Sequence, residues 1–148
     1  MRSAFGCTAV PVQLPIGKEH EFTGVIDLLT MKAYRYSGDK PAPAEEAVPD
    51  DLKDAAEEAR SALTEMIAES DEALMEAFFE SGGLSDEQMI SGLRNSVRER
   101  KIFPVACTAA THMIGATKIL DLIVDVMPSP DARGSITGTV PGGEEEIQ

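Results

Sequence analysis

The sequence has no tryptophan, only two cysteines, and few aromatic residues, which make up 5% of its 148 residues. Two cysteines, Cys7 and Cys107, are too few for the disulfide framework of a small secreted domain. No apolar run approaches the roughly 20 residues of a membrane helix, and the longest, Ile119 to Met127, contains Asp121 and Asp125. The first residues also lack the sustained apolar segment of a signal peptide. We therefore expect a cytoplasmic protein without a membrane segment, whose cysteines are reduced.

Basic residues are scarce as well. The sequence has 13 Lys and Arg against 26 Asp and Glu, which gives a net charge of -13. Binding to DNA requires Lys and Arg that displace counterions from the phosphates, so we expect no direct DNA binding. The acidic residues are concentrated between Glu45 and Glu87, where only Lys53 and Arg60 are basic. This distribution favours a basic protein partner.

The motifs that hold a nucleotide are absent from the sequence. It contains no GxxxxGK followed by Ser or Thr, and no Asn-Lys-x-Asp. The nearest string, Val12 to Glu19, has Val in place of the first Gly and Glu in place of the hydroxyl that binds Mg²⁺. Without these groups the transition state of phosphoryl transfer is not stabilised. We expect this chain alone to have no catalytic residues for that reaction and no cofactor of its own.

The first third of the sequence has the pattern of β-strands. Ala9 to Ile16 is apolar and β-branched, but Pro11 and Pro15 cannot donate to a ladder, so this strand should be short or lie at an edge. Two more strands and then a Pro-rich and Ala-rich loop are predicted at Phe22 to Leu29, Lys32 to Tyr36, and Gly38 to Val48.

Apolar residues at helical spacing predict three helices in the middle of the sequence. These helices cover Asp50 to Ser70, Asp71 to Glu80, and Ser85 to about Arg98. We expect Ser70 to cap the second helix, and Gly82 and Gly83 to end it by allowing positive φ. The third helix has the best-marked start, because Ser85 and Gln88 occupy the two positions of a capping box.

A strand and a fourth helix follow. Ile102 to Thr108 is apolar on both sides of the strand period, which is typical of a strand buried on both faces in a parallel sheet. Gly115 to Met127 is predicted as a helix whose inward residues are Ile119, Leu120, Ile123, Val124 and Met127. We therefore predict an α/β fold, with a small mixed sheet packed by three helices and a terminal strand-helix unit.

Five groups of residues occur in one order along the chain. They are Val12-Gln13-Leu14-Pro15-Ile16-Gly17; Phe22-x-Gly24-Val25-Ile26-Asp27-Leu28; Met31-Lys32-Ala33-Tyr34-x-Tyr36; Glu69-x-Asp71 with Leu74-Met75; and Pro104-Val105 leading to Leu120-Asp121-x-x-Val124-Asp125 and Pro128-Ser129-Pro130. Together they resemble bacterial translation elongation factor G, from roughly Thr8 to Pro130. Release factors of the GTPase class and ribosome-protection proteins share parts of this pattern, but the run Met31 to Tyr36 favours elongation factor G.

The resemblance implies a fragment of a GTP-hydrolysing ribosomal factor that acts in tRNA–mRNA translocation or subunit recycling. Residues 8–101 would be a subdomain inserted into the GTPase domain, residues 102–130 the last strand and helix of the GTPase core, and residues 131–148 a linker and the start of a β-barrel domain. GTP and magnesium would be bound by the full-length parent, through segments before Met1. The strand Ile102 to Thr108 would then lack sheet neighbours, so we expect the isolated chain to self-associate through it or to leave it poorly ordered.

The resemblance also places one guanine-facing loop in this chain, at Ala109, Ala110 and Thr111. The family has Ser-Ala-Leu or Ser-Ala-Lys here, and the backbone N–H of the Ala meets the guanine oxygen. Ala110 retains this residue, whereas Ala109 replaces the Ser and offers no hydroxyl to brace the loop, and Thr108 stands where Gly is usual. We therefore expect a divergent paralogue whose base recognition is less preorganised.

The inserted subdomain of this family contacts the C-terminal domain of the ribosomal stalk protein. Asp54, Glu57, Glu58 and Glu65 lie away from the apolar stripe of the first predicted helix and are our candidates for that contact. Exposed charge pairs contribute about 0–1 kcal/mol each, so such a contact would be fast, weak and salt-sensitive. The other interpretation of these residues is a solvated acidic face, and the alternative function is a stand-alone acidic protein-binding module unrelated to the ribosome.

Cys107 and His112 are five residues apart at the end of a predicted strand, and a thiol near an imidazole is the pattern of a nucleophile and its base. Because no third partner or oxyanion donor is evident, we favour a buried structural cysteine beside a loop histidine. His20 and His112, without a CxxC, give no zinc signature, and we predict no metal site.

Overall fold

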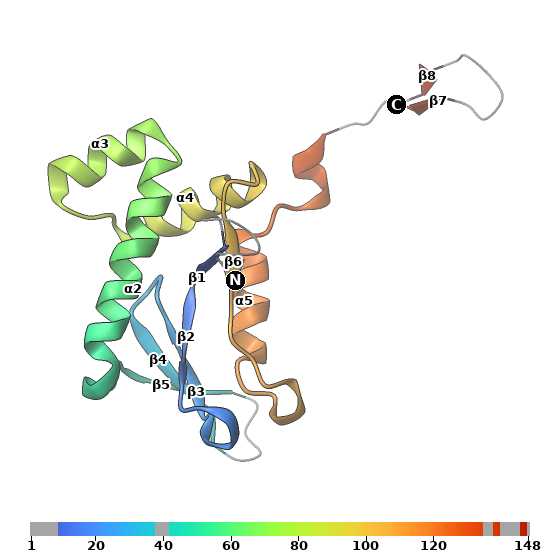
Figure 1. Ribbon diagram of the computed structural model, residues 1–148. Coiled ribbons are helices and arrows are strands. Elements are labelled where there is room, and N and C mark those ends of the chain that lie inside the picture. The colour runs from blue at the N-terminus through green and yellow to red at the C-terminus, as the bar shows by residue number, and fades with distance from the viewer. Residues whose placement is uncertain (1–8, 38–41, 135–137, 140–145, 148) are drawn as a thin grey trace.

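The computed structural model describes residues 9–37, 42–134, 138–139 and 146–147, and it has the predicted α/β fold (Figure 1). A four-stranded antiparallel sheet has the order β2-β3-β4-β5. Its strands are β2 (Gln13–Ile16), β3 (Gly24–Asp27), β4 (Lys32–Arg35) and β5 (Ala44–Ala47). The first predicted strand is short and lies at an edge of this sheet, which accommodates Pro15 because a proline cannot donate to a ladder.

The N-terminal strand bends at Val12 and joins two kinds of pairing. Before the bend, β1 (Ala9–Pro11) is parallel to β6 (Phe103–Val105), as predicted for the late strand. Val12 N–H donates to Val105 O at 3.0 Å, and Val12 O accepts the N–H of Leu28 at 3.0 Å. Parallel and antiparallel pairings therefore meet at one residue. The small sheet that we predicted to be mixed is antiparallel throughout, because the parallel pair of β1 and β6 lies outside it.

Strand β5 corrects the prediction of a loop across Gly38 to Val48. All four of its residues are exposed, so no apolar alternation marks it in the sequence. It pairs with β4, and the ion pairs Lys32–Glu45 (2.6 Å) and Arg35–Glu46 (3.4 Å) cross between the two strands. The strand forms because it satisfies the open backbone edge of β4 and brings opposite charges to diagonal positions of the register, within reach of long side chains.

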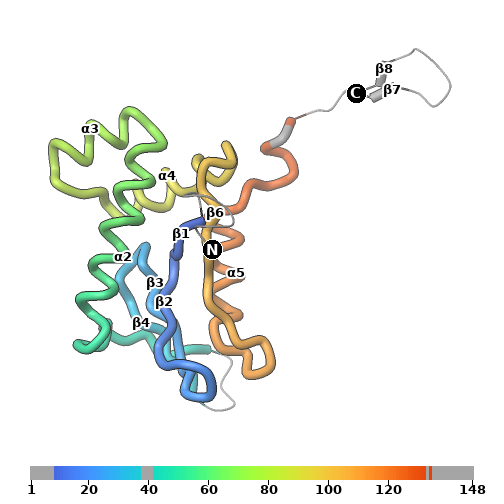
Figure 2. The backbone as a smooth tube through the Cα atoms, viewed as in Figure 1, coloured from blue at the N-terminus to red at the C-terminus, as the bar shows by residue number. Residues whose placement is uncertain are grey.

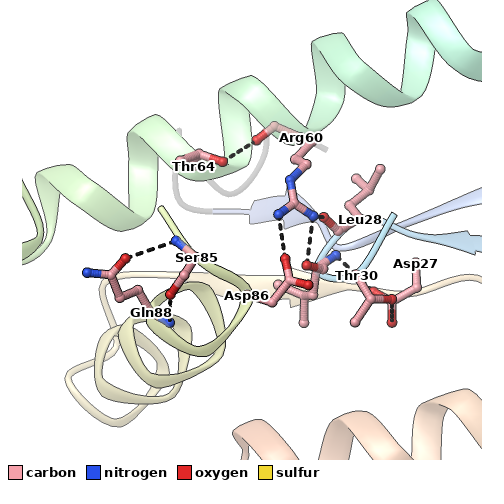
Figure 3. Close-up of polar contacts among 9 residues, drawn as sticks. Asp27, Leu28, Thr30, Arg60, Thr64, Ser85, Asp86 and Gln88 are labelled. Carbon is pink, nitrogen blue, oxygen red and sulfur yellow. Dashed lines mark hydrogen bonds and ion pairs between the residues drawn. The ribbon is translucent and has the colours of Figure 1, made fainter. Parts of the chain in front are cut away.

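Four helices are present where the periodicity predicts them. They are α2 (Asp50–Glu69), α3 (Glu72–Ser81), α4 (Asp86–Arg98) and α5 (Ala116–Val126). The capping box of α4 is confirmed, since Ser85 Oγ accepts the N–H of Gln88 at 3.2 Å and the Gln88 side chain accepts the N–H of Ser85 at 2.9 Å (Figure 3). None of the described helices is long and apolar enough to cross a membrane.

The start of α3 differs from the prediction. Asp71, not Ser70, is the N-cap, and its carboxylate accepts the backbone N–H of Ala73 at 2.9 Å. The hydroxyl of Ser70 instead bonds to Ile67 O at 2.7 Å and to the hydroxyl of Ser96 at 2.6 Å, which ties α2 to α4. At the other end of α3, only Gly82 adopts a positive φ, of 74°.

One hydrophobic core joins the sheet to α2 and α4, and Figure 2 traces the path of the backbone around it. Leu63 and Ile67 of α2 and Met89 and Leu93 of α4 are fully buried in this core. The guanidinium of Arg60, at the edge of this core, links α2 to the end of β3 and to the start of α4. It donates to Leu28 O at 2.9 Å and Leu29 O at 2.7 Å, and pairs with Asp86 at 2.7 Å (Figure 3).

Helix α5 does not bury the face that the sequence predicts. Val126 is its one fully buried residue, and Ile119 is half-buried. The other four predicted inward residues are exposed, with exposed fractions of 62% for Leu120, 47% for Ile123, 79% for Val124 and 37% for Met127. An apolar stripe requires a partner, but the described part of this chain does not cover it.

Strand β6 shows the same incompleteness. Phe103 is 53% exposed, and β1 is the only strand paired with β6 among the described residues. Burial on both faces, which we predicted for Ile102 to Thr108, is therefore not achieved, although Ile102 itself is buried.

Several predictions concern residues outside the described part of the chain. These are Cys7, residues 38–41 of the predicted loop, and most of 131–148. Within the last segment, β7 (Gly138–Thr139) and β8 (Glu146–Ile147) pair with each other in antiparallel fashion.

Candidate functional site

The predicted guanine-facing residues lie in a closed loop between β6 and α5. Ala109 N–H donates to Ile114 O at 3.0 Å, and Ile114 N–H donates to Ala109 O at 3.2 Å. The short 3₁₀ turn η3 (Ala110–His112) lies between these two residues in the chain. The loop is therefore held by reciprocal backbone hydrogen bonds at its neck.

A second set of contacts folds the loop back onto the end of β6. Thr108 Oγ1 donates to Ile114 O at 2.8 Å. Gly115 has a φ of 79°, and a Cβ at this position would lie 2.5 Å from Cys107 O. The hydroxyl of Thr108 thus braces the loop, and the tight return requires glycine at 115.

The tip of the loop presents a backbone donor. Ala110 and Thr111 are exposed, and Ala109 is half-buried. No acceptor for the N–H of Ala110 is found among the residues that the structure describes. A backbone N–H in this position can donate to an oxygen of a ligand without breaking a hydrogen bond of the protein.

The base of the loop is attached to the start of β2 by Gln13, a residue that sequence reasoning did not select. Gln13 is 4% exposed. Its side-chain oxygen accepts the N–H of Cys107 at 3.3 Å, and Cys107 Sγ donates to Gln13 O at 3.8 Å. A single glutamine in a strand gives no sign in the sequence that it anchors a distant loop. The contact becomes visible only once β1 is seen to pair with β6, which brings Gln13 next to Cys107.

Cys107 takes part in this attachment through its backbone N–H and its thiol. Burial raises the pKa of its thiol, which disfavours the reactive thiolate. His112 lies exposed at the end of η3. No hydrogen bond joins it to Cys107 in the described part of the chain. Cys107 is half-buried and not fully buried as we expected, because the loop covers its side chain only in part.

The second candidate site is the outer face of α2. Asp54, Glu57, Glu58 and Glu65 are all exposed, on the side opposite the buried Leu63. None of the four forms an ion pair with another described residue. They form an open anionic face, and this geometry is compatible with a docking surface and with a solvated surface alike.

A third polar cluster lies between the sheet and α5, around a cavity of about 150 Å³ whose lining includes Asp27, Lys118 and Asp121. Burial raises the pKa of the Asp27 carboxyl, although it accepts hydrogen bonds from Leu29 N–H at 2.9 Å and from the Thr30 hydroxyl at 3.1 Å. Lys118 pairs with Asp121 at 2.7 Å. These contacts explain the cluster as part of the packing between the antiparallel sheet and α5.

Across the described residues, no group of three or more His, Cys, Asp or Glu is placed to hold a metal ion.

Comparison with known proteins identifies the fold but no family. No protein-family model matches the sequence. A protein of Thermus thermophilus with a known crystal structure is similar to this chain, with a TM-score of 0.79 and 31% sequence identity over 92% of the chain. The chain spans only 20% of the length of that protein. The similarity supports the α/β fold and is consistent with a fold of the elongation factor G type.

Proposed function

We propose that this chain is part of a GTP-hydrolysing ribosomal translation factor of the elongation factor G type, or of a divergent paralogue, and that it acts in the cytoplasm during tRNA–mRNA translocation. Within that factor it serves as the partner-binding insert and supplies the guanine-facing loop. GTP and magnesium are bound by the longer parent protein.

The observation that carries this proposal is the position and form of the loop at 109–111. It follows the carboxyl end of a strand in a parallel pair and precedes a helix, which is where open α/β sheets bind ligands. Its closed neck and the N–H of Ala110, which has no acceptor among the described residues, fit the recognition of a carbonyl oxygen by a backbone donor. In the elongation factor G family, which the five groups of residues resemble, the loop at this position faces guanine.

The exposed apolar surfaces support a larger parent. The stripe of α5, with Val124 at 79% exposure, and the side chain of Phe103 on β6 need cover that the described residues do not provide. Further strands and helices of a parallel GTPase sheet would cover both, since strands of such sheets are buried on both faces.

The first test concerns the loop in the whole protein. Ala110→Pro removes the backbone N–H at the first position of η3, where the extended conformation of Ala109 tolerates a following proline. We expect guanine nucleotide affinity to fall about tenfold, because one hydrogen bond to the ligand is lost. Ala110→Gly keeps the N–H and should bind nearly as well. Equal affinity of all three proteins would remove the guanine-facing role.

The second test concerns the partner. The purified C-terminal domain of the ribosomal stalk protein should bind this chain weakly, and binding should decrease as salt increases. Glu58→Lys on the outer face of α2 should weaken it further. A stand-alone acidic module unrelated to the ribosome predicts no association with the stalk domain at any salt concentration, so this measurement separates the two functions.

A further inference from the structure

The parallel pair of β1 and β6 ends where the chain turns into the antiparallel sheet, at Val12. Val12 N–H donates to Val105 O at 3.0 Å, which is the last hydrogen bond of the parallel ladder. If that ladder continued, the next hydrogen bond would run from Cys107 N–H to Val12 O. Val12 O accepts Leu28 N–H instead, at 3.0 Å. The backbone N–H of Cys107 therefore loses its ladder acceptor just before the loop at 109–114.

Gln13 takes the place of this acceptor. Its side-chain oxygen Oε1 accepts Cys107 N–H at 3.3 Å, and the residue is 4% exposed. A backbone N–H without an acceptor is costly to bury, so the glutamine side chain is well suited to this position. One residue of the antiparallel sheet thus fixes the path of the chain three residues before Ala110.

Tyr36 attaches the other end of the loop to the same sheet. Its phenol oxygen lies 2.9 Å from the hydroxyl oxygen of Thr117, and both residues are half-buried. Thr117 is the second residue of α5 and lies two residues after Gly115, where the loop turns back. The antiparallel sheet therefore holds the loop both before its neck and after it.

The contacts inside the loop fix its shape but not its orientation. The reciprocal hydrogen bonds of Ala109 and Ile114 join two residues of the loop to each other. The direction in which the N–H of Ala110 points therefore depends on where the two ends of the loop are held. A hydrogen-bond donor contributes to recognition only when it is aimed at the position of its acceptor.

We propose that Gln13 and Tyr36 are positioning residues for guanine recognition. From the antiparallel sheet they hold the two ends of the loop so that the N–H of Ala110 meets the carbonyl oxygen of the base. This inference rests on the guanine-facing role proposed above, and it extends that role to two residues that act through the loop.

The test measures nucleotide binding by the whole parent protein with two probes. One is GDP, and the other is the diphosphate of 2-aminopurine riboside, whose base lacks the carbonyl oxygen of guanine. Gln13→Met removes the acceptor of Cys107 N–H, and Tyr36→Phe removes the phenol oxygen. Each should weaken GDP binding about three- to fivefold, because a misdirected hydrogen bond loses part of its contribution. Binding of the analogue should change by less than about twofold, since it offers no oxygen to the Ala110 donor.

A double variant separates positioning from general support of the structure. In Ala110→Pro the donor is already absent, so the orientation of the loop no longer affects that hydrogen bond. Adding Gln13→Met to Ala110→Pro should therefore lower GDP affinity by less than about twofold more, as expected for two residues that act through one interaction. A purely structural role of Gln13 predicts that the two losses multiply.

Matched controls remove or retain hydroxyl groups. Ser96→Ala removes one partner of a hydroxyl pair between α4 and α2, at 2.6 Å from Ser70 Oγ, and should change neither affinity. Thr117→Ser keeps the hydroxyl that Tyr36 contacts and should bind GDP like the parent, whereas Thr117→Val should resemble Tyr36→Phe. Circular dichroism reports whether each variant is folded. Tyr36→Phe and the two Thr117 variants decide the test if Gln13→Met does not fold.

The possible failures are distinguishable. If Ala110→Pro weakens GDP binding but Gln13→Met and Tyr36→Phe do not, the positioning role is wrong and the guanine-facing role stands. An equal loss for GDP and for the analogue in the latter two variants also overturns the positioning role, because it indicates general damage to the site. If Ala110→Pro itself leaves GDP affinity unchanged, the guanine-facing role and this inference are both wrong.

Discussion

The phenol oxygen of Tyr36, just after β4, lies 2.9 Å from the hydroxyl oxygen of Thr117 in α5, a contact across 81 residues. The ammonium group of Lys118 lies 4.0 Å from the centre of the Tyr34 ring beside it. These contacts hold the antiparallel sheet to the start of α5, directly after the closed loop at 109–114. The antiparallel sheet and the loop therefore share one support.

The first prediction concerns this hydroxyl pair. Tyr36→Phe and Thr117→Val should each lower the free energy of unfolding by about 0.5–1.5 kcal/mol, since each removes one partner of a half-buried hydrogen bond. The double variant should lose less than the sum of the two, because both changes remove the same interaction. Urea denaturation measures all three values. Ser61→Ala, an exposed position on α2, is the control and should change stability less. Strict additivity would show that the hydroxyls do not interact in solution.

The second prediction concerns the return of the loop at Gly115. Gly115→Ala should destabilise the protein by about 1–3 kcal/mol, because the residue has a positive φ and little space for a Cβ. Gly83→Ala is the matched control, since Gly83 has no positive φ and no atom near its added Cβ. That change should be neutral or slightly stabilising. Thermal or urea unfolding measures the stability of both variants. Similar stabilities would show that the loop has room for a side chain at position 115.

The third prediction concerns the pH dependence of stability and two carboxyl groups, Asp27 and Glu45, whose pKa values are shifted in opposite directions. Burial raises the pKa of Asp27, so the folded protein binds its proton more tightly than the unfolded chain. The contribution of Asp27 to stability should therefore fall as pH rises from its ordinary pKa through the raised one. The hydrogen bond from Lys32 lowers the pKa of Glu45. Its contribution should be present above the ordinary pKa of a glutamate and be lost as pH falls through the lowered value.

Unfolding free energies of the parent chain, Asp27→Asn and Glu45→Gln, measured across the acidic range, separate these effects. The stability difference between the parent chain and Asp27→Asn should decrease with rising pH, and the difference for Glu45→Gln should increase. Direct titration of the Asp27 carboxyl by NMR provides a second measurement. Two differences that change in the same direction with pH would show that one of the assignments is wrong.

The helices were predictable because their signals are local. The reciprocal hydrogen bonds of Ser85 and Gln88 follow from two residue types at a fixed spacing, and the apolar stripe of α2 matches the buried Leu63 and Ile67. Strand β5 was not predictable, because its residues are all exposed and its stability comes from the edge of β4 and the charges of Lys32 and Arg35. Pairing between strands is a tertiary property that one segment does not reveal.

The orientation of α5 shows a different limit. Periodicity identifies an apolar face, including Leu120 and Val124, but it does not say which part of which molecule covers that face. The candidate loop was also only partly predictable. Its residues were located through resemblance, whereas the brace from Thr108 and the attachment through Gln13 depend on contacts that only the fold creates. The expectation of a less preorganised loop rests on the resemblance alone, and the structure adds the contact of the Thr108 hydroxyl with Ile114 O.

The last prediction follows from the uncovered apolar surface. The isolated chain should self-associate through β6 and the exposed apolar face of α5, because Phe103 and Val124 are exposed and an apolar strand with an open edge tends to pair. Sedimentation velocity should show a concentration-dependent increase in mass. Phe103→Lys and Val124→Lys should each shift the population toward the monomer, since a charge in an apolar interface is costly to bury.

Phe79→Lys is the control for this experiment, because Phe79 is nearly as exposed as Val124 but lies on α3. If association depends on the surface that the rest of a parallel sheet would cover, Phe79→Lys should leave the mass distribution unchanged. A monodisperse monomer in which Ile102 to Thr108 is strongly protected from hydrogen exchange would contradict the prediction. Such a result would mean that β1 alone is a sufficient partner for β6, and it would weaken the inference that the chain is part of a larger sheet.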